Sequence, residues 1–224
     1  MALPPPPASH RNQDVELQFS HHWTDWLHAM YKRKLSSIAD VSAEVPADGD
    51  VVSYDSASST WVSEPPSGTW ISLGALTTTS GGTPILWSSI PAGVKHLRLT
   101  LLQISTDGAN NIRVRFGDED GIDSTNYGSA SCRFTASAVA TDSSTTYFDV
   151  YRTAAADIYS GIIDFTWSSG HLWVASGNYS DNSGPPAGTT SGYCDLPKEL
   201  TQVQVSVSAD LWDGGAAELW YQQP

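Results

Sequence analysis

The feature that most constrains the fold of this chain is a strict alternation of apolar and polar residues in three short segments. Leu97, Leu99 and Leu101 alternate with polar residues, and the segments 112–116 and 203–207 repeat the pattern with Ile, Val and Phe. A period of two places every second side chain on one face of a β-strand, and a single buried face is typical of antiparallel sheets. Weaker strand patterns occupy 70–76, 85–87, 131–136, 145–151, 160–167, 171–176 and 218–221.

These segments, joined by Gly, Ser, Asp and Asn, predict a mainly β fold of about ten short strands. Two antiparallel sheets packed face to face bury the alternating face of each strand. We therefore expect an antiparallel β-sandwich of the jelly-roll kind. No helical period is present after Leu35.

The N-terminal segment predicts a short α-helix that follows a Pro-rich arm. Four prolines at positions 4–7 favour an extended chain. Asn12 is suited to cap a helix, and Lys32-Arg33-Lys34 falls in its last turn, where the helix dipole favours bases. A lone helix cannot bury a broad apolar face, so this face must pack on the rest of the chain, on sister helices or on another protein. The residues of the face that we expect to anchor the chain to a partner are Phe19, Trp23, Trp26, Leu27, Met30 and Tyr31.

A β-hairpin connects the predicted helix to the predicted sandwich. The segments 51–54 and 60–62 have strand composition, and Pro65-Pro66 marks a linker after them. A two-stranded hairpin is marginally stable alone, so it needs partner chains or a docking surface. We therefore expect an arm with an anchoring helix at 1–35, a hairpin connector at 36–68 and a β-sandwich domain at 69–224.

Charge and composition exclude several classes of function. The net charge is −13, and an acidic surface repels phosphate, so we expect no nucleic-acid partner. No apolar run approaches the ~20 residues of a membrane span, and the first residues lack the pattern of a secretory signal, so we expect no membrane association. Two cysteines, Cys132 and Cys194, do not make a disulfide framework, and we expect both to be reduced.

No familiar catalytic or phosphate-binding motif is present, so we expect no enzymatic activity and no cofactor. A Ser-His-Asp triad would need His96 or His171, but both fall in strand patterns as outward polar residues. A glycosidase needs a facing carboxylate pair. The carboxylates available within strands, which fit the polar half of an alternating strand, are Asp149, Asp164 and Glu218.

Clustered acids and histidines do not predict a metal site. The acidic turn 118–123 has Gly in its fourth place rather than the sixth, so it departs from the calcium-binding loop. His21 and His28 share a helix face but are seven positions apart, whereas zinc ligands on one helix are about four apart. We interpret the acids as a solvated turn and the histidines as polar residues of the helix.

Four aromatic residues flank a Gly-, Ser- and Pro-rich stretch at 177–192 that we expect to be a long loop. Exposed flat rings of this kind are suited to stack on sugar rings. The candidate glycan-binding residues are therefore Trp167, Trp173, Tyr179 and Tyr193. Burial of Trp167 and Trp173 in the core is the alternative interpretation.

Several short motifs together resemble structural proteins of tailed bacteriophage particles. In the connector, Ala39-Asp40-Val41, the segment 49–55 and Trp61-Val62 are similar to a short repeat of phage fibres. The Pro-rich opening with residues 9–12 is also similar to the start of phage appendage proteins. Further motifs of this kind are the segment 89–95 leading into 97–101, then Phe116-Gly117-Asp118, Gly121-Ile122 and Tyr127-Gly128.

The resemblance implies a non-enzymatic virion component that is assembled in the host cytoplasm. Its N-terminal segment would dock on other virion proteins and its β-domain would point outward, and proteins of this kind are often homotrimers. A tail fibre, a head fibre and a capsid decoration protein all stay open, because the chain is short and has no repeat that forms a shaft. The alternative is a carbohydrate- or receptor-binding module that attaches to a host-surface glycan. A glycan-cleaving enzyme is a weaker third class.

Overall fold

The computed structural model describes residues 50–55, 59–64, 66, 68–74, 77–78, 81–182 and 187–223. These residues form antiparallel sheets and contain no helix, which confirms the mainly β prediction for the described part of the chain. The predicted helix lies outside the described residues. So do the residues expected to anchor it to a partner, Phe19, Trp23, Trp26, Leu27, Met30 and Tyr31.

The chain divides into two compact units, and the boundary falls between residues 66 and 67. In the first unit, β1 (Val51–Asp55) and β2 (Thr60–Glu64) pair as the predicted antiparallel hairpin. The rings of Tyr54 and Trp61 meet edge to face across it, with their centroids 5.4 Å apart. The second unit, residues 67–224, holds all the other strands and is called the β unit below.

The larger sheet of the β unit has nine strands, and all neighbouring strands are antiparallel. Its strands lie in the order β10 (Val139–Ser144), β9 (Tyr127–Phe134), β14 (Ala187–Asp195), β13 (Leu172–Asp181), β12 (Tyr159–Ser169), β6 (His96–Thr106), β16 (Trp212–Gln222) and β3 (Trp70–Ser72), and β4 (Thr77–Thr78) also pairs with β16. The strands β12, β13 and β14 form consecutive hairpins. The earlier strand β9 lies beside β14, which is a Greek-key arrangement.

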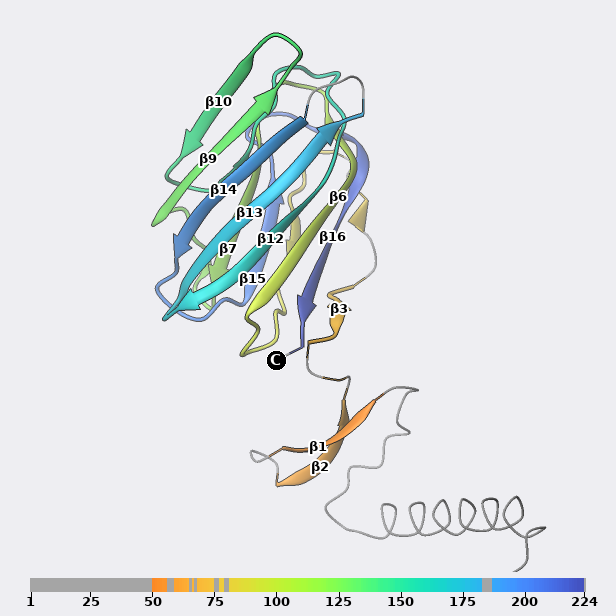
Figure 1. The fold of residues 1–224 in the computed structure, drawn as a ribbon, viewed down its shortest axis with the longest axis vertical. Helices are drawn as coiled ribbons and strands as arrows, with labels where there is room; N and C mark the ends of the chain where they lie inside the picture. The colour runs from red at the N-terminus through yellow and green to blue at the C-terminus, as the bar shows by residue number, and fades with distance from the viewer. Residues whose placement is uncertain are drawn as a thin grey trace, which may run out of the picture. The chain divides into compact units, whose positions relative to one another are not determined.

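The smaller sheet has five strands and lies behind the larger one in Figure 1. Its strands lie in the order β11 (Phe148–Val150), β7 (Ile112–Asp118), β15 (Gln202–Ser206) and β5 (Ile85–Trp87), and β8 (Gly121–Ile122) pairs with β7. The chain crosses between the sheets several times, for example from β6 to β7 and from β14 to β15. Strands far apart in sequence therefore become neighbours.

The two sheets share one hydrophobic core. The ring of Phe165 on the larger sheet lies 4.9 Å from that of Phe116 and 5.2 Å from that of Phe148, both on the smaller sheet. The three alternating leucines of β6 and the apolar residues of β7 and β15 belong to this core. The alternation therefore identified the buried faces of these three strands correctly.

The prediction of a long loop at 177–192 is wrong. This stretch contains half of β13 and most of β14, and the two strands pair along nearly their whole length. Gly188 of β14 lies opposite Tyr179 of β13, and a methyl group at Gly188 would overlap the Tyr179 ring. A glycine, which usually marks a turn, is needed here because the neighbouring strand supplies the side chain that fills this part of the core.

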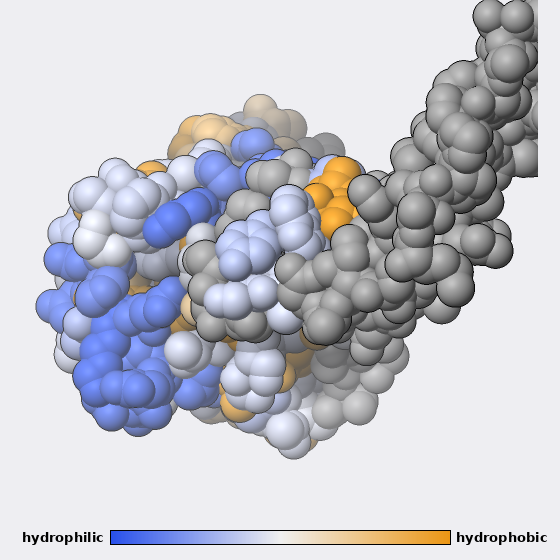
Figure 2. Space-filling view, turned by 90° about the horizontal axis from the view of Figure 1, so that it is seen from below, coloured by the Kyte–Doolittle hydropathy of each residue, from blue (hydrophilic) through white to orange (hydrophobic). Residues whose placement is uncertain are grey.

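Among the coloured residues of the surface seen from below, most are hydrophilic or intermediate, and the apolar patches are small and separate (Figure 2). This distribution is ordinary for a protein surface, where single apolar side chains are common. The described part of the chain has no helix that is both long and apolar enough to span a membrane.

Candidate functional site

The β unit carries a broad groove of about 720 Å³. Its lining residues lie mainly on β12 and β13, with contributions from β6, β9 and β14. Phe165 and Trp173 of β12 and β13 point into the core, so the residues next to them in sequence point to the opposite side. We call this side of the larger sheet, which faces away from the smaller sheet, the outer face. The groove lies on it.

Three cross-strand rows form the floor of the groove. They are Asp164 opposite Ser176, Ile162 opposite Asn178, and Ser160 opposite Ser180. Phe134 of β9 lies at one end of the groove, and both Phe134 and Ile162 are 44% exposed. The groove thus combines short hydroxyl and amide side chains with two exposed apolar side chains.

The two charged side chains of the groove bind each other. Arg98 donates from Nε to Oδ1 of Asp164 over 2.7 Å and from Nη2 to Oδ2 over 3.0 Å, so the pair is bidentate. The bond to Asp164 raises the pKa of Arg98. Among the described residues that line the groove, only these two are charged. The groove therefore has no net charge of its own.

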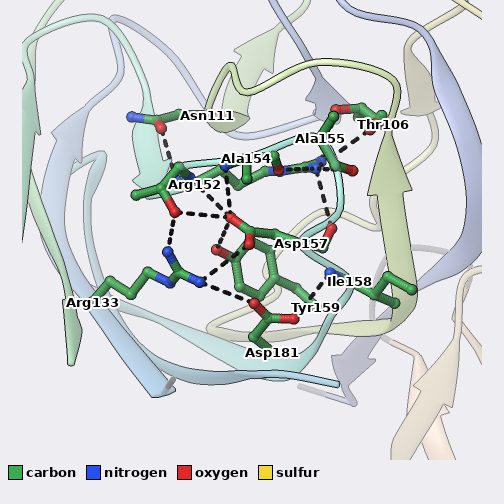
Figure 3. Close-up of polar contacts among 11 residues, drawn as sticks. Thr106, Asn111, Arg133, Arg152, Ala154, Ala155, Asp157, Ile158, Tyr159 and Asp181 are labelled. Carbon is green, nitrogen blue, oxygen red and sulfur yellow. Dashed lines mark hydrogen bonds and ion pairs between the residues drawn. The ribbon is translucent and has the colours of Figure 1, made fainter. Parts of the chain in front are cut away.

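A buried polar network lies on the inner side of the same strand ends (Figure 3). Arg133 of β9 binds Asp157 over 3.1 Å and Asp181 of β13 over 3.0 Å. Asp157 also accepts a hydrogen bond from the backbone N–H of Thr153 over 2.9 Å and one from the Tyr159 hydroxyl over 3.1 Å. These bonds fix the segment between β11 and β12 against β9 and β13.

Arg152 holds the other side of this segment. Its side chain is only 2% exposed, and Nη1 donates to the Thr106 hydroxyl over 2.7 Å. Nη2 donates to the backbone carbonyls of Ala154 and Asp157, each over 3.1 Å. Burial lowers the pKa of Arg152 below its usual value, but nearby carboxylates, Asp157 among them, oppose the effect. The guanidinium therefore acts as a structural cross-link.

The network and the groove are parts of one arrangement. Three groove residues directly adjoin network residues in sequence: Phe134 follows Arg133, Ser160 follows Tyr159, and Ser180 precedes Asp181. Because side chains alternate along a strand, each network residue points inward and its neighbour points into the groove. The buried ion pairs thus hold the strand ends that carry this part of the groove.

The four aromatic residues predicted to bind glycan do not form one surface. Trp173 and Tyr179 are each 3% exposed and belong to the core, and Tyr179 also borders the groove. Tyr193 is 51% exposed on the outer face, where its ring lies against Gly128 of β9. Trp167 is half-buried and lines a separate pocket of about 180 Å³ with Trp173.

Comparison with known proteins does not assign a family. No protein-family model matches the sequence, and no curated protein matches it. The resemblance to phage structural proteins therefore stays a prediction from sequence motifs. Function has to be argued from the groove and from the arrangement of the chain.

The carboxylates weighed as a glycosidase pair are not brought together. Asp149 is fully buried and accepts a hydrogen bond from Asn111 over 2.9 Å, whereas Asp164 binds Arg98 on the outer face. Glu218 accepts a hydrogen bond from the Ser72 hydroxyl over 2.8 Å. The three groups lie in separate surroundings, each with its own partner.

The other candidate groups also have structural partners. His96 lies 3.4 Å from the Thr166 hydroxyl, and His171 lies 3.1 Å from the carbonyl of Pro197. In the acidic turn 118–123, Glu119 and Asp120 bind Lys198. The described ranges contain no group of three or more His, Cys, Asp or Glu residues that could hold a metal ion.

The two cysteines are free thiols. Cys194 of β14 is buried in the core, and burial raises the pKa of its thiol to about 12. Cys132 of β9 is half-buried and faces Thr189 on the outer side of the same sheet. The sheet therefore separates the two sulfur atoms, in agreement with the expectation that both are reduced.

Proposed function

We propose that the chain is a non-enzymatic structural component of a tailed-bacteriophage particle. In this proposal residues 1–35 anchor it to other virion proteins, residues 36–68 form a connector, and the β unit is exposed. The observation that carries the proposal is the boundary between residues 66 and 67, directly after Pro66, which separates the hairpin from the β unit. An appendage needs such an arrangement, with one part for attachment and an outer part that folds independently.

The proposal includes a β-sandwich of the jelly-roll kind for the β unit. Ring contacts between Phe116, Phe148 and Phe165 across the two sheets support a sandwich. The Greek-key arrangement of β9 with β12, β13 and β14 supports a jelly roll, which is built from Greek keys.

The oligomer and the location belong to the same proposal. The aromatic stripe around Trp23 and Trp26 offers more apolar area than one short helix can bury against itself. We therefore propose a homo-oligomer, a trimer, held at its N-terminal segments and incorporated into the virion in the host cytoplasm.

The test is to attach a tag to the chain and to purify phage particles from a host that produces the tagged chain. Quantitative mass spectrometry of density-banded particles is expected to find the chain in a fixed ratio to the major capsid protein. Imaging of the labelled tag then distinguishes a head from a tail position. A chain that remains in the soluble lysate while complete particles band without it would contradict the proposal.

A second candidate function is a carbohydrate- or receptor-binding module, and the position of the groove favours it. The chain enters the β unit near Gly68, whose N–H donates to the carbonyl of Gln223, directly after the end of β16. This end of β16 pairs with Leu97, at the start of β6. Tyr159 pairs with Ile104, near the far end of β6, and adjoins Ser160 of the groove. The apolar end of the groove thus lies at the end of the sheet opposite the entering chain, where an outward-pointing unit would meet a host surface.

A further inference from the structure

We propose that the groove on the outer face binds a stretch of an uncharged polysaccharide. This inference deepens the second candidate function and rests on it, because it names the chemical class of the ligand. It concerns the groove alone and does not depend on how the chain is anchored.

The charges of the groove argue for an uncharged ligand. Arg98 and Asp164 satisfy each other through two hydrogen bonds, so neither has to pair with a ligand. An acidic polymer would also approach a chain of net charge −13, which repels it. A basic polymer would be attracted by the negative net charge of the chain, but this attraction would come from residues outside the groove. A neutral polymer is the class that binds in the groove without breaking its ion pair.

The polar side chains of the floor fit sugar hydroxyl groups. Ser176, Asn178 and Ser180 are exposed and occupy alternate positions of β13, so their side chains point the same way. Serine hydroxyls and the asparagine amide each donate and accept hydrogen bonds. Sugar hydroxyls also do both, so either partner can adjust to the other.

The apolar side chains supply the second element of a sugar site. Phe134 and Ile162 expose a ring and a branched alkyl group at 44% each, and both line the same groove. The C–H faces of a sugar ring can pack on such side chains while its hydroxyls remain bonded to the polar floor. A volume of about 720 Å³ spread over several strands suits several sugar units rather than one.

The network behind the groove prepares it for binding. Arg133 joins Asp157 to Asp181, and these residues adjoin or cross-link the strand ends that carry Phe134, Ser160 and Ser180. A site that is held in place before binding loses less conformational entropy when the ligand binds. This matters for sugars, whose individual contacts are weak.

The test uses the full chain and soluble hexasaccharides as probes. Malto-, cello- and chitohexaose are the neutral probes, an oligogalacturonate is the acidic one, and a chitosan hexamer is the basic one. Saturation-transfer NMR followed by titration is expected to show saturable binding of at least one neutral hexamer and weaker binding of both charged ones. The proposal would be overturned if none of the neutral hexamers bound saturably, or if a charged hexamer bound more tightly than the neutral ones.

Variants locate the site. Asn178→Ala and Phe134→Ser are each expected to weaken binding of the neutral hexamer by at least about tenfold. The matched control is Val174→Ser, which changes an exposed residue of β13 on the same face but outside the groove, and it should leave the affinity unchanged. Equal affinities for all variants would place the sugar elsewhere. Loss of binding only in Trp167→Ala would place it in the small pocket instead.

A second copy of the chain is the competing occupant of the groove. Sedimentation of wild type, Asn178→Ala and Phe134→Ser is expected to give the same oligomer, because the proposed trimer is held at the N-terminal segments and not at the groove. A change of oligomer in the groove variants would identify an interface and overturn the proposal.

The particle experiment keeps the two proposals separate. Groove variants are expected to enter particles like wild type, since the proposed anchor lies at residues 1–35. Failure of sugar binding would leave the particle proposal intact, whereas absence of the wild-type chain from particles would leave the groove result intact.

Discussion

At the scale of single residues, Asp149 is a carboxyl group whose ionisation opposes folding. Its side chain is 0% exposed, and burial raises its pKa to about 6, although hydrogen bonds from Ser131 and Asn111 act in the opposite direction. The ordinary pKa of the unfolded chain is 3.8, so the folded state binds this proton more tightly. The contribution of Asp149 to stability therefore rises as the pH falls from 7 through 6 toward 4.

Replacement of this carboxyl group tests the sign of its effect on the pH dependence of stability. We expect Asp149→Asn to gain stability relative to wild type by about 1 kcal/mol more at pH 7 than at pH 5, because only wild type has to bury a charge at pH 7. Urea unfolding of both proteins at the two pH values measures the difference. Asp195→Asn, which changes an exposed carboxylate of β14, is the control. A stability difference that does not vary with pH would contradict this account of Asp149.

Gly188 is a second residue whose role is local. Because a methyl group there would overlap the buried ring of Tyr179, we expect Gly188→Ala to lower the free energy of unfolding by about 1–3 kcal/mol. Ser191→Ala, an exposed change on the same strand, should stay within about 0.5 kcal/mol of wild type.

A second substitution tests the cause. Tyr179→Leu removes the ring, so the cost of Gly188→Ala should be smaller in that background, as a double-mutant cycle measures. An undiminished cost would mean that the ring is not what excludes the methyl group.

At the scale of elements, the sequence predicted those strands whose own residues fill the core. The alternating apolar residues of β6, β7 and β15 lie in the core. The strand β14 was missed because its inward positions include Gly188, Thr190 and Gly192, and the space beside Gly188 is filled by Tyr179 of the next strand. The strand β10 was missed because it is an edge strand with one strongly apolar residue, Val139. A pattern within one strand cannot reveal a side chain supplied by its neighbour.

The candidate site was predictable only in part. Of the four predicted aromatic residues, only Tyr179 borders the groove, and it is 3% exposed; the groove itself depends on which strands become neighbours. The ion pairs behind it join Arg133 to residues 24 and 48 positions away. Arg and Asp are residue types that usually lie on the surface. The burial of these residues therefore depends on which strands become neighbours, which the sequence pattern does not reveal. The one local signal is the alternation of β9, which places Arg133 on the inner face with Ser131.

At this scale we predict that the buried network stabilises the segment between β11 and β12. We expect Arg152→Met to lower the free energy of unfolding by about 3–5 kcal/mol, because it removes the donor to the Thr106 hydroxyl and to the backbone carbonyls of Ala154 and Asp157, and each buried polar group left unpaired costs about 1–3 kcal/mol. Arg98→Met is the control, since the Arg98–Asp164 pair is substantially exposed and should be worth about 1 kcal/mol or less. Denaturant titration of the two variants measures both values, and equal losses would show that the network does not stabilise this segment.

At the scale of the whole molecule, the proposal assigns attachment to the N-terminal segment and exposure on the particle to the β unit. The β unit has its own core and lies beyond the boundary at residues 66 and 67. The aromatic stripe that includes Trp23 and Trp26 precedes this boundary. We expect the double substitution Trp23→Ala with Trp26→Ala to leave the melting of the β unit nearly unchanged. Calorimetry checks this, because loss of buried Trp from a shared core typically costs ~3–5 kcal/mol for each residue.

The amount of this double variant in purified particles tests the central claim most directly. Each Trp ring can bury roughly 150–250 Å², and aromatic residues of this kind dominate protein interfaces. We predict that the variant, expressed at the level of wild type and melting like it, is absent from density-banded particles that incorporate wild type. Incorporation of the variant at the wild-type ratio would contradict the claim that residues 1–35 anchor the chain.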